Sequence, residues 1–163
     1  ELDINDFSDE LSLSWAILLY PIVTSGEQAR VLLVDMRASS NLAKKVGRVI
    51  EATHQISSIG EATEPNVRRV LFLWGVEFPV ALAVLKTFKK IPSQRLLSVF
   101  NQVIELEGSR GPQSPLDGNE IMGIVGHGPI VGRAINYLTA LIFQVGLISR
   151  QEAIKALEDW SSS

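Results

Sequence analysis

The chain has 163 residues, a formal net charge of −3 and no cysteine. It therefore has no disulfide framework, no catalytic thiol and no cysteine-ligated zinc or iron–sulfur centre, and its two histidines, His54 and His127, are too few for a histidine-rich metal site. Hydrophobic residues make up 46% of the chain and charged residues 20%, which is typical of a globular protein rather than a disordered one.

Apolar periodicity predicts helices from the first residues onward, and no alternating strand pattern lies between hairpin turns. Ser8 is placed to cap a first helix that Pro21 ends. Ser25 and Gln28 form a capping-box pattern that opens a second helix. The apolar positions expected to face inward are Leu11, Trp15, Leu18 and Leu19 on the first helix, and Val31, Leu32 and Val34 on the second.

A third, longer helix is expected to start at Ser39 or Ser40, and prolines mark the starts of the next three helices. The buried side expected for the third helix consists of Leu42, Val46, Val49, Ile50 and Ile56. The starts and ends expected for the next three are Pro65 and Gly75, Pro79 and about Lys90, and Pro92 and Gly108.

Residues 108–116 are rich in Gly, Ser and Pro and form the one segment with the composition of a linker. Beyond it, Asp117 with Glu120 and Ser149 with Glu152 are capping-box patterns, and an apolar helix is expected over residues 129–145, with a final helix ending near Trp160. The sequence thus predicts an all-α fold of about nine helices, with a larger bundle at residues 1–107, the linker, and a small tail at residues 117–163.

Location and charge add two expectations. The longest apolar run, Trp15 to Val23, is interrupted by Pro21 and is shorter than the roughly 18 residues of a membrane span, and the acidic start is unlike a signal peptide. We expect a cytoplasmic protein without membrane contact, and a piece of a longer chain because the first residue is Glu1. Residues 28–100 contain eleven basic and five acidic residues, a net charge of +6 that the acidic first ten residues mask.

The residue patterns of common catalytic sites are missing from the chain, including a Walker sequence, a Gly-x-Ser-x-Gly elbow and a His-Asp dipeptide. Glu105 and Glu107 have the spacing of paired metal ligands on a strand, but on a helix they point to different faces, which indicates a solvated helix end. Composition leaves a Ser/His/acid triad open, yet no residue stands out as a nucleophile. We expect no catalytic residue, metal ligand or cofactor in this segment.

A glycine-rich turn at residues 126–129 is the first candidate for binding. Gly126, His127, Gly128 and Pro129 precede a helix whose free N–H groups suit an anion, and Arg133 lies one turn further on. The pattern from Gly126 to Ile135 resembles helix-hairpin-helix elements that hold a nucleic-acid backbone. The alternative is an ordinary tight corner in which Gly132 lets two helices approach.

The second candidate is a set of basic residues at helical spacing, which could follow a phosphate backbone. Its members are Lys44, Lys45, Arg48, Arg68, Arg69, Lys86, Lys89, Lys90, Arg95 and, in the linker, Arg110. The alternative is that these residues are only the solvated sides of amphipathic helices. The aromatic residues expected in the core rather than as platforms for bases are Trp15, Phe72, Trp74, Phe78 and Tyr137.

Three stretches resemble a known family. Residues 13–20 read Leu-Ser-Trp-Ala-Ile-Leu-Leu-Tyr, residues 36–46 contain Met-Arg-Ala-Ser-Ser-Asn, and residues 115–135 contain Pro-Leu, Ile-Met and His-Gly-Pro-Ile-Val-Gly. In this order they resemble the C-terminal helical region of class II tRNA nucleotidyltransferases, the CCA-adding enzymes, and of the related bacterial poly(A) polymerases. The chain departs from the family pattern at Asn119, which stands where a basic residue is usual, at Glu120 in place of Asp, and at His127 in place of Pro.

The resemblance implies a role in tRNA processing as the RNA-holding part of a transferase. A separate N-terminal head of the parent chain would bind Mg and ATP or CTP and add nucleotides, while this segment would need no cofactor and would hold tRNA or another structured RNA. The residues then expected to contact RNA are the basic set other than Arg95, together with Gly126, His127, Gly128 and Arg133. The alternative function is a helical protein–protein or homodimer module, which the mean hydropathy of +0.20 favours. A third, an independent enzyme, requires a polar pocket with converging carboxylates or histidines.

Overall fold

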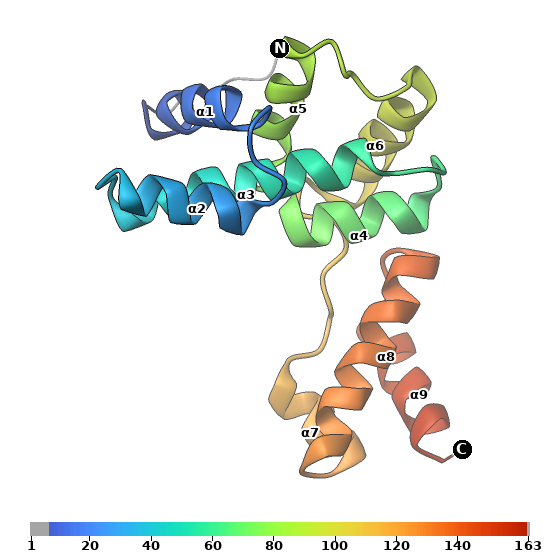
Figure 1. The fold of residues 1–163 in the computed structure, drawn as a ribbon. Helices are drawn as coiled ribbons and strands as arrows, with labels where there is room; N and C mark the ends of the chain where they lie inside the picture. The colour runs from blue at the N-terminus through green and yellow to red at the C-terminus, as the bar shows by residue number, and fades with distance from the viewer. Residues whose placement is uncertain (1–6, 163) are drawn as a thin grey trace.

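A computed structural model describes the backbone of residues 7–162, in which nine helices and no strand occur (Figure 1). This confirms the predicted all-α fold. The helices are α1 (Phe7–Leu19), α2 (Gly26–Asp35), α3 (Ser40–Ser57), α4 (Glu64–Trp74), α5 (Phe78–Thr87), α6 (Gln94–Glu107), α7 (Gly118–Val125), α8 (Pro129–Val145) and α9 (Arg150–Ser161).

Most helix ends lie where cap chemistry predicts them. The reciprocal capping boxes of α7 and α9 are both present, and Gly146 ends α8. The box of α2 is only half formed, because Ser25 accepts from the Gln28 N–H while the Gln28 side chain accepts from Thr24 instead of from Ser25. The predicted cap at Ser8 lies outside the described side chains, and the described part of α1 begins at Phe7.

Helix α5 ends three residues before the predicted position. Lys89 adopts the left-handed backbone conformation with φ 55°, and the Lys90 N–H donates to the Leu85 carbonyl, which closes the helix. Arg37, with φ 62°, closes α2 in the same way through the Ala38 N–H and the Leu33 carbonyl. A β-carbon makes this conformation unfavourable, so both positions are ones that glycine would suit better.

Helices α1–α6 surround the larger of two hydrophobic clusters in the described part of the chain. Helix α2 lies along α3, and the two backbones meet where Gly26 faces Gly47; a β-carbon on Gly47 would stand 2.7 Å from the Gly26 carbonyl oxygen. This approach fixes the buried face of α2. Ala29 and Leu33 point inward, one and two turns after Gly26, and the prediction that Val31 and Val34 do so is wrong.

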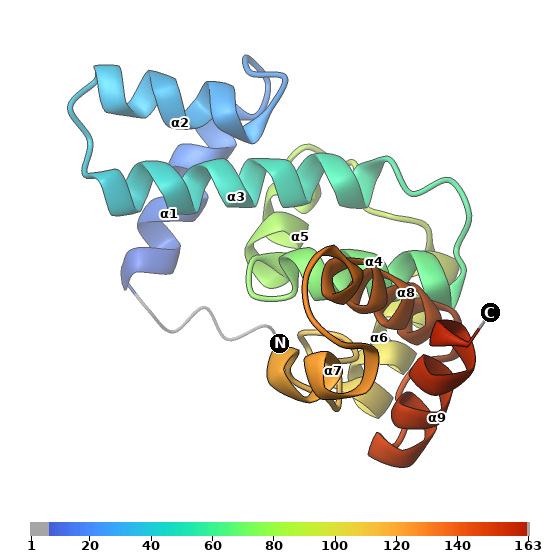
Figure 2. The same cartoon turned by 90° about the horizontal axis from the view of Figure 1, so that it is seen from below.

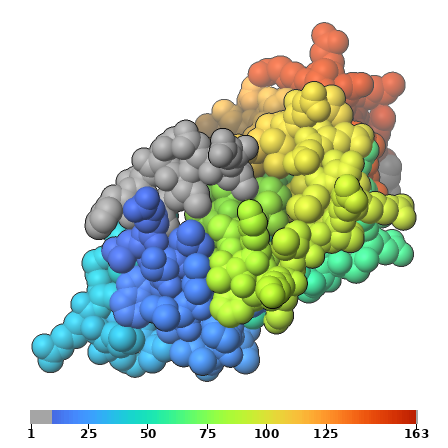
Figure 3. All heavy atoms as spheres, turned by 90° about the horizontal axis from the view of Figure 1, so that it is seen from above, coloured from blue at the N-terminus to red at the C-terminus, as the bar shows by residue number. Residues whose placement is uncertain are grey.

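The predicted buried stripe of α1 is also partly wrong. Ser12, Ala16 and Leu19 are buried, whereas Leu11 and Leu18 are exposed. On α3 the prediction holds better, because Val46, Val49, Ile50 and Ile56 are all buried. Seen from above, α1, α5 and α6 lie together on one face of the bundle (Figure 3).

The smaller cluster belongs to α7–α9, which follow the extended segment after α6 and lie to one side of the bundle (Figures 1 and 2). Leu138 and Leu157 are at its centre, and the ring of Tyr137 stacks on that of Trp160 with 5.5 Å between centroids. Contacts between α4 and α8 connect the two groups of helices.

Arg68 on α4 makes the main polar connection between the two groups. Its Nε donates to Glu107 at 2.8 Å, its Nη2 to Glu64 at 2.6 Å, and its Nη1 to the carbonyl oxygens of Phe143 and Gln144 at 3.3 and 3.2 Å. The arginine thereby ties α4 and α6 to the carboxyl end of α8, where a cation is favourable. Glu107, predicted as part of a solvated helix end, is buried in this ion pair.

Within the described residues, no single helix is both long and apolar enough to cross a membrane. Helices α4 and α5 satisfy the length and composition test only as a pair, and they are bent by 106° at the break between them.

Candidate nucleic-acid interface

The first half of α3 carries three of the predicted basic residues. Lys44 and Arg48 are one turn apart and exposed, whereas Lys45 is half-buried. Lys44 has no ion-pair partner among the described residues, so its full charge is available to a ligand.

Arg48 is held in place by acceptors on α4 and on the turn that follows α4. Its Nε and Nη2 donate to the two carboxylate oxygens of Glu77 at 2.5 and 2.9 Å, and Nη2 also donates to the Leu73 carbonyl at 3.2 Å. The hydrogen bond with the buried Glu77 raises the pKa of Arg48. The guanidinium lies 5.0 Å from the centre of the Trp74 ring, although 51% of the Arg48 side chain remains exposed.

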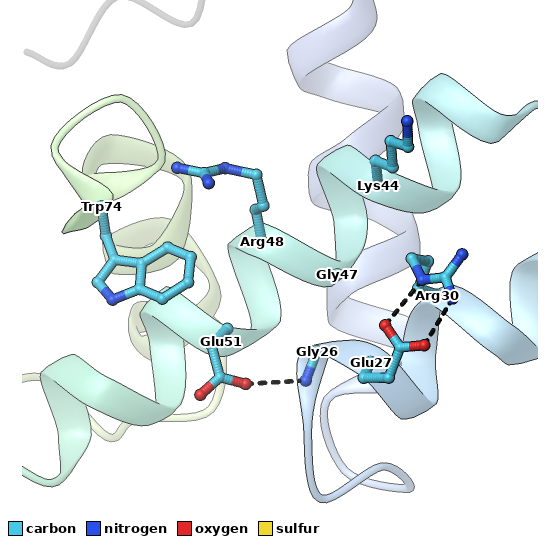
Figure 4. Close-up of a pocket in the computed structure, with 8 residues that line it drawn as sticks. All are labelled: Gly26, Glu27, Arg30, Lys44, Gly47, Arg48, Glu51 and Trp74. Atoms are coloured by element: carbon cyan, nitrogen blue, oxygen red, sulfur yellow. Dashed lines mark hydrogen bonds and ion pairs between the residues drawn. The ribbon is translucent and has the colours of Figure 1, made fainter. Parts of the chain in front are cut away.

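A pocket of about 290 Å³ lies beside these two side chains, between α2, α3 and the end of α4 (Figure 4). Its lining residues are Gly26, Glu27, Arg30, Lys44, Gly47, Arg48, Glu51 and Trp74. Because Gly26 and Gly47 carry no side chain, the two helices approach closely here, and Trp74, Lys44 and Arg30 stand around this crossing in Figure 4.

Both carboxylates that line this pocket accept hydrogen bonds from within the chain. Both oxygens of Glu27 accept from Arg30, at 2.7 and 2.6 Å, and this hydrogen bonding lowers the pKa of Glu27. Glu51 accepts from the Gly26 N–H through Oε2 at 3.0 Å. Arg30 and Arg48 each have a carboxylate partner, whereas Lys44 and Glu51 line the pocket without an ion-pair partner among the described residues.

The predicted lysines around α5 lie elsewhere. Lys86, Lys89 and Lys90 are exposed, and the Lys90 Nζ lies 5.5 Å from the centre of the Tyr20 ring. Lys90 lines a second cavity, of about 570 Å³, together with Ser57 at the carboxyl end of α3. A helix rises 1.5 Å per residue, so this cavity is about 20 Å along α3 from Lys44.

Three predicted arginines lie near the junction of the two groups of helices. Arg68 is 5% exposed and its donors are occupied within the chain, so its predicted contact with RNA is wrong. Arg69 is exposed, with its guanidinium carbon 5.9 Å from the centre of the Phe143 ring. Arg110 is exposed, and its backbone packs against Gly75 at the end of α4.

Arg95, at the start of α6, is exposed and lines a further cavity of about 460 Å³ together with Thr63 and Ser93. This cavity adjoins the one that Lys90 lines, because Ser93 belongs to both. The basic set is therefore divided among the start of α3, the opposite end of α3, and the junction.

The turn at residues 126–129 is open to solvent. Gly126 and Gly128 have φ angles of 86° and 91°, which require glycine, and His127 is exposed between them. No side chain caps the start of α8, where Pro129 has no N–H group and the Val131 N–H donates to the Gly128 carbonyl at 3.1 Å. Arg133 is exposed one turn along. A β-carbon on Gly132 would meet no atom within 4 Å, so Gly132 does not serve a close helix approach.

Sequence reasoning missed the residues that complete the pocket. Arg30 and Glu51 received no role, and Trp74 was expected in the core although it is only half-buried. The spacing of Glu27 and Arg30 predicts their ion pair, but no local pattern connects Arg48 with Trp74. Comparison with family models, curated proteins and solved structures finds no match. In the part of the chain that the structure describes, no group of three or more acidic or histidine side chains could hold a metal ion.

Proposed function

We propose that this chain binds structured RNA, with tRNA as the first candidate, and serves as the RNA-holding region of a nucleotidyltransferase or poly(A) polymerase. Nucleotide addition would be carried out by a separate head of the parent chain. The observation that carries the proposal is the exposed basic surface at the start of α3, where Lys44 is uncompensated and Arg48 is fixed in place. The family resemblance of residues 115–135 supports it.

The chemistry of RNA explains why such a surface suffices. Helical RNA hides most base edges in a deep groove, so proteins hold it mainly through phosphates, 2′-hydroxyls and shape. Lysines on a rigid helix supply the charge, and the open glycine turn at residues 126–129 lets a phosphate approach the backbone beside the exposed Arg133. These are two separate places of contact, one in each group of helices.

The salt dependence of binding tests the proposal. For the wild-type chain we expect the logarithm of tRNA affinity to fall linearly with the logarithm of salt concentration. Lys44→Ala combined with Arg133→Ala should make that slope less negative by about 0.7–0.9 for each phosphate that the variant no longer binds. Arg48 is left intact because its removal would leave Glu77 buried without a partner. Lys155→Ala, an exposed lysine on α9 outside the proposed surface, is the matched control.

The outcomes separate clearly. An unchanged slope in the double variant removes these residues from the interface, and the absence of tRNA binding by the wild-type chain at low salt refutes the proposal as a whole. Circular dichroism and thermal melting of each variant establish that a loss of affinity does not come from unfolding.

A second candidate function is a protein–protein or homodimer module. Several large apolar side chains are exposed on α1, α2 and the turns that follow them: Leu18, Ile22, Val31, Val34 and Met36. Exposed apolar residues of this kind often mark an interface when they are contiguous. Sedimentation of the purified chain tests it, because a tight dimer that is insensitive to salt and does not bind tRNA would favour this function over RNA binding.

A further inference from the structure

The pocket beside α3 combines features that a phosphate-binding surface alone does not need. The guanidinium of Arg48 lies over the Trp74 ring, and the two together are called the Arg48–Trp74 platform. Two acceptors, Glu77 and the Leu73 carbonyl, hold the guanidinium there. Three of its N–H donations are used, so its charge is largely satisfied, while about half of the side chain stays exposed. An immobilised guanidinium with an open side is a surface on which a nucleobase stacks.

The size of the pocket sets what can enter. A volume of about 290 Å³ is at the small end of the range for ligand sites, and it suits a single base rather than several. The crossing of α2 and α3 at Gly26 and Gly47 brings backbone rather than side chains to this point. In Figure 4 the remaining side chains stand around the crossing, with Trp74 and Arg48 on one side and Arg30 with Glu27 on the other.

Two polar groups near the platform suit the rest of a nucleotide. Lys44 lies one turn before Arg48 and has no ion-pair partner among the described residues, so it is available to a phosphate. Glu51 uses Oε2 to accept from Gly26, and its Oε1 accepts no hydrogen bond from the described residues. A carboxylate oxygen in this position accepts from the exocyclic amino group of a base.

We propose that this pocket holds one unpaired nucleotide of the bound RNA, with its base on the Arg48–Trp74 platform, its amino group at Glu51 and its phosphate at Lys44. The proposal rests on the proposed RNA-binding function and specifies the part of the RNA that the site takes. Adenine, cytosine and guanine carry an exocyclic amino group and uracil does not, so an unpaired uridine should bind most weakly.

The experiment compares a blunt RNA hairpin with the same hairpin carrying four unpaired adenosines or four unpaired uridines at its 3′ end. For the wild-type chain, the adenosine extension should tighten binding about tenfold relative to the blunt hairpin, in line with the affinity that one stacked base contributes. The uridine extension should tighten it less. If neither the blunt nor the extended hairpin binds, the RNA-binding function itself is refuted. If the blunt and adenosine hairpins bind equally well, only the proposed nucleotide pocket is refuted.

Two variants identify the groups responsible. Trp74→Leu removes the ring beneath Arg48 and should remove most of the gain from either extension while blunt binding persists. Glu51→Gln should bring the adenosine and uridine hairpins close to equal affinity. Lys155→Ala on α9 is the control and should preserve both differences. A gain from the extension that Trp74→Leu leaves undiminished contradicts the proposal.

A second readout needs no substitution at the platform. The chain labelled with 5-fluorotryptophan gives one fluorine resonance for each of Trp15, Trp74 and Trp160, assigned from single Trp→Phe variants. The adenosine hairpin should shift the Trp74 resonance, and the blunt hairpin should leave it in place. A Trp74 resonance that stays in place when the adenosine hairpin is bound overturns the proposal, even where Trp74→Leu fails to fold.

Discussion

Replacing Arg68 with alanine should be among the most destabilising single changes in the chain. The side chain of Arg68 is buried, and so is that of its partner Glu107, whereas its other carboxylate partner, Glu64, is partly exposed. Removing the guanidinium leaves Glu107 as a buried charge without its cation, which costs about 3–5 kcal/mol. The Glu64 pair adds little, about 0–1 kcal/mol, because water screens it.

This loss is large against the total stability of a domain, about 5–15 kcal/mol. Urea denaturation followed by circular dichroism measures it, and a loss of about 3 kcal/mol in a chain of this length should lower the melting temperature by about 6–12 °C. Arg69→Ala, the exposed neighbour whose ring contact with Phe143 is worth about 0.5–1 kcal/mol, is the matched control.

A double substitution checks the assigned cause. Arg68→Met combined with Glu107→Met replaces the buried pair with apolar side chains of similar volume, and it should cost less than Arg68→Ala alone because no charge is left unpaired. The reasoning is refuted if Arg68→Ala costs less than about 1 kcal/mol, or if the double variant is the less stable of the two.

Three further predictions concern the backbone and the helix ends. Gly47→Ala should lower the free energy of unfolding by about 1–3 kcal/mol, because the new β-carbon would press on the Gly26 carbonyl. Gly132→Ala, with open space around it, should raise the free energy of unfolding by about 0.5–1 kcal/mol, and urea titrations measure both changes. Arg37→Gly should stabilise by about 0.5–1 kcal/mol, because the left-handed conformation at this position is unfavourable for a residue with a β-carbon, and an unchanged or lower melting temperature would contradict this. The backbone hydrogen bond at the start of α9 lowers the pKa of Glu152, so its contribution to stability is present above the unfolded-state pKa and is lost as the pH falls through the folded-state value; Glu152→Gln should remove this part of the acid dependence in melts between about pH 3 and pH 6.

The helix boundaries could be predicted because their causes are local in sequence. Ser39 and Asp117 each accept a hydrogen bond from an N–H group two or three residues further on, and these residue types at that spacing are visible without any tertiary contact. The left-handed conformation of Lys89, which ends α5, could not be predicted because it has no local sequence signal. A lysine gives no signal for a left-handed helix end, so the expected helix ran on too far.

The buried face of α2, and part of the buried face of α1, were missed because small residues set them. Gly26 and Gly47, 21 positions apart in the chain, bring α2 and α3 together, and Ala29 follows on the same side. Counting large apolar residues instead favoured Val31 and Val34, which are exposed. Only the contact between helices reveals which side of an apolar helix is buried.

The two arginines Arg48 and Arg68 show why the basic set could not be resolved from sequence. Each lies on a helix beside other basic residues, and the sequence alone makes each equally available to a phosphate. Their roles are decided by acids far away along the chain, since Arg48 pairs with Glu77 and Arg68 with Glu107. Partial exposure then separates them, because the side chain of Arg48 remains half open while that of Arg68 is enclosed.

The pairing of Arg48 with Glu77 also makes the two proposals separable by salt. Phosphate contacts through Lys44 release counterions, so their contribution to RNA affinity should weaken steeply as the salt concentration rises. Stacking on a guanidinium that a buried carboxylate already neutralises releases few ions. The adenosine-extended and uridine-extended hairpins carry the same added phosphates, so the advantage of the first over the second should stay nearly constant while the affinity of both falls. An adenosine advantage that disappears in parallel with the affinity would mean that the extensions add phosphate contacts alone, and that Arg48 and Trp74 take no base.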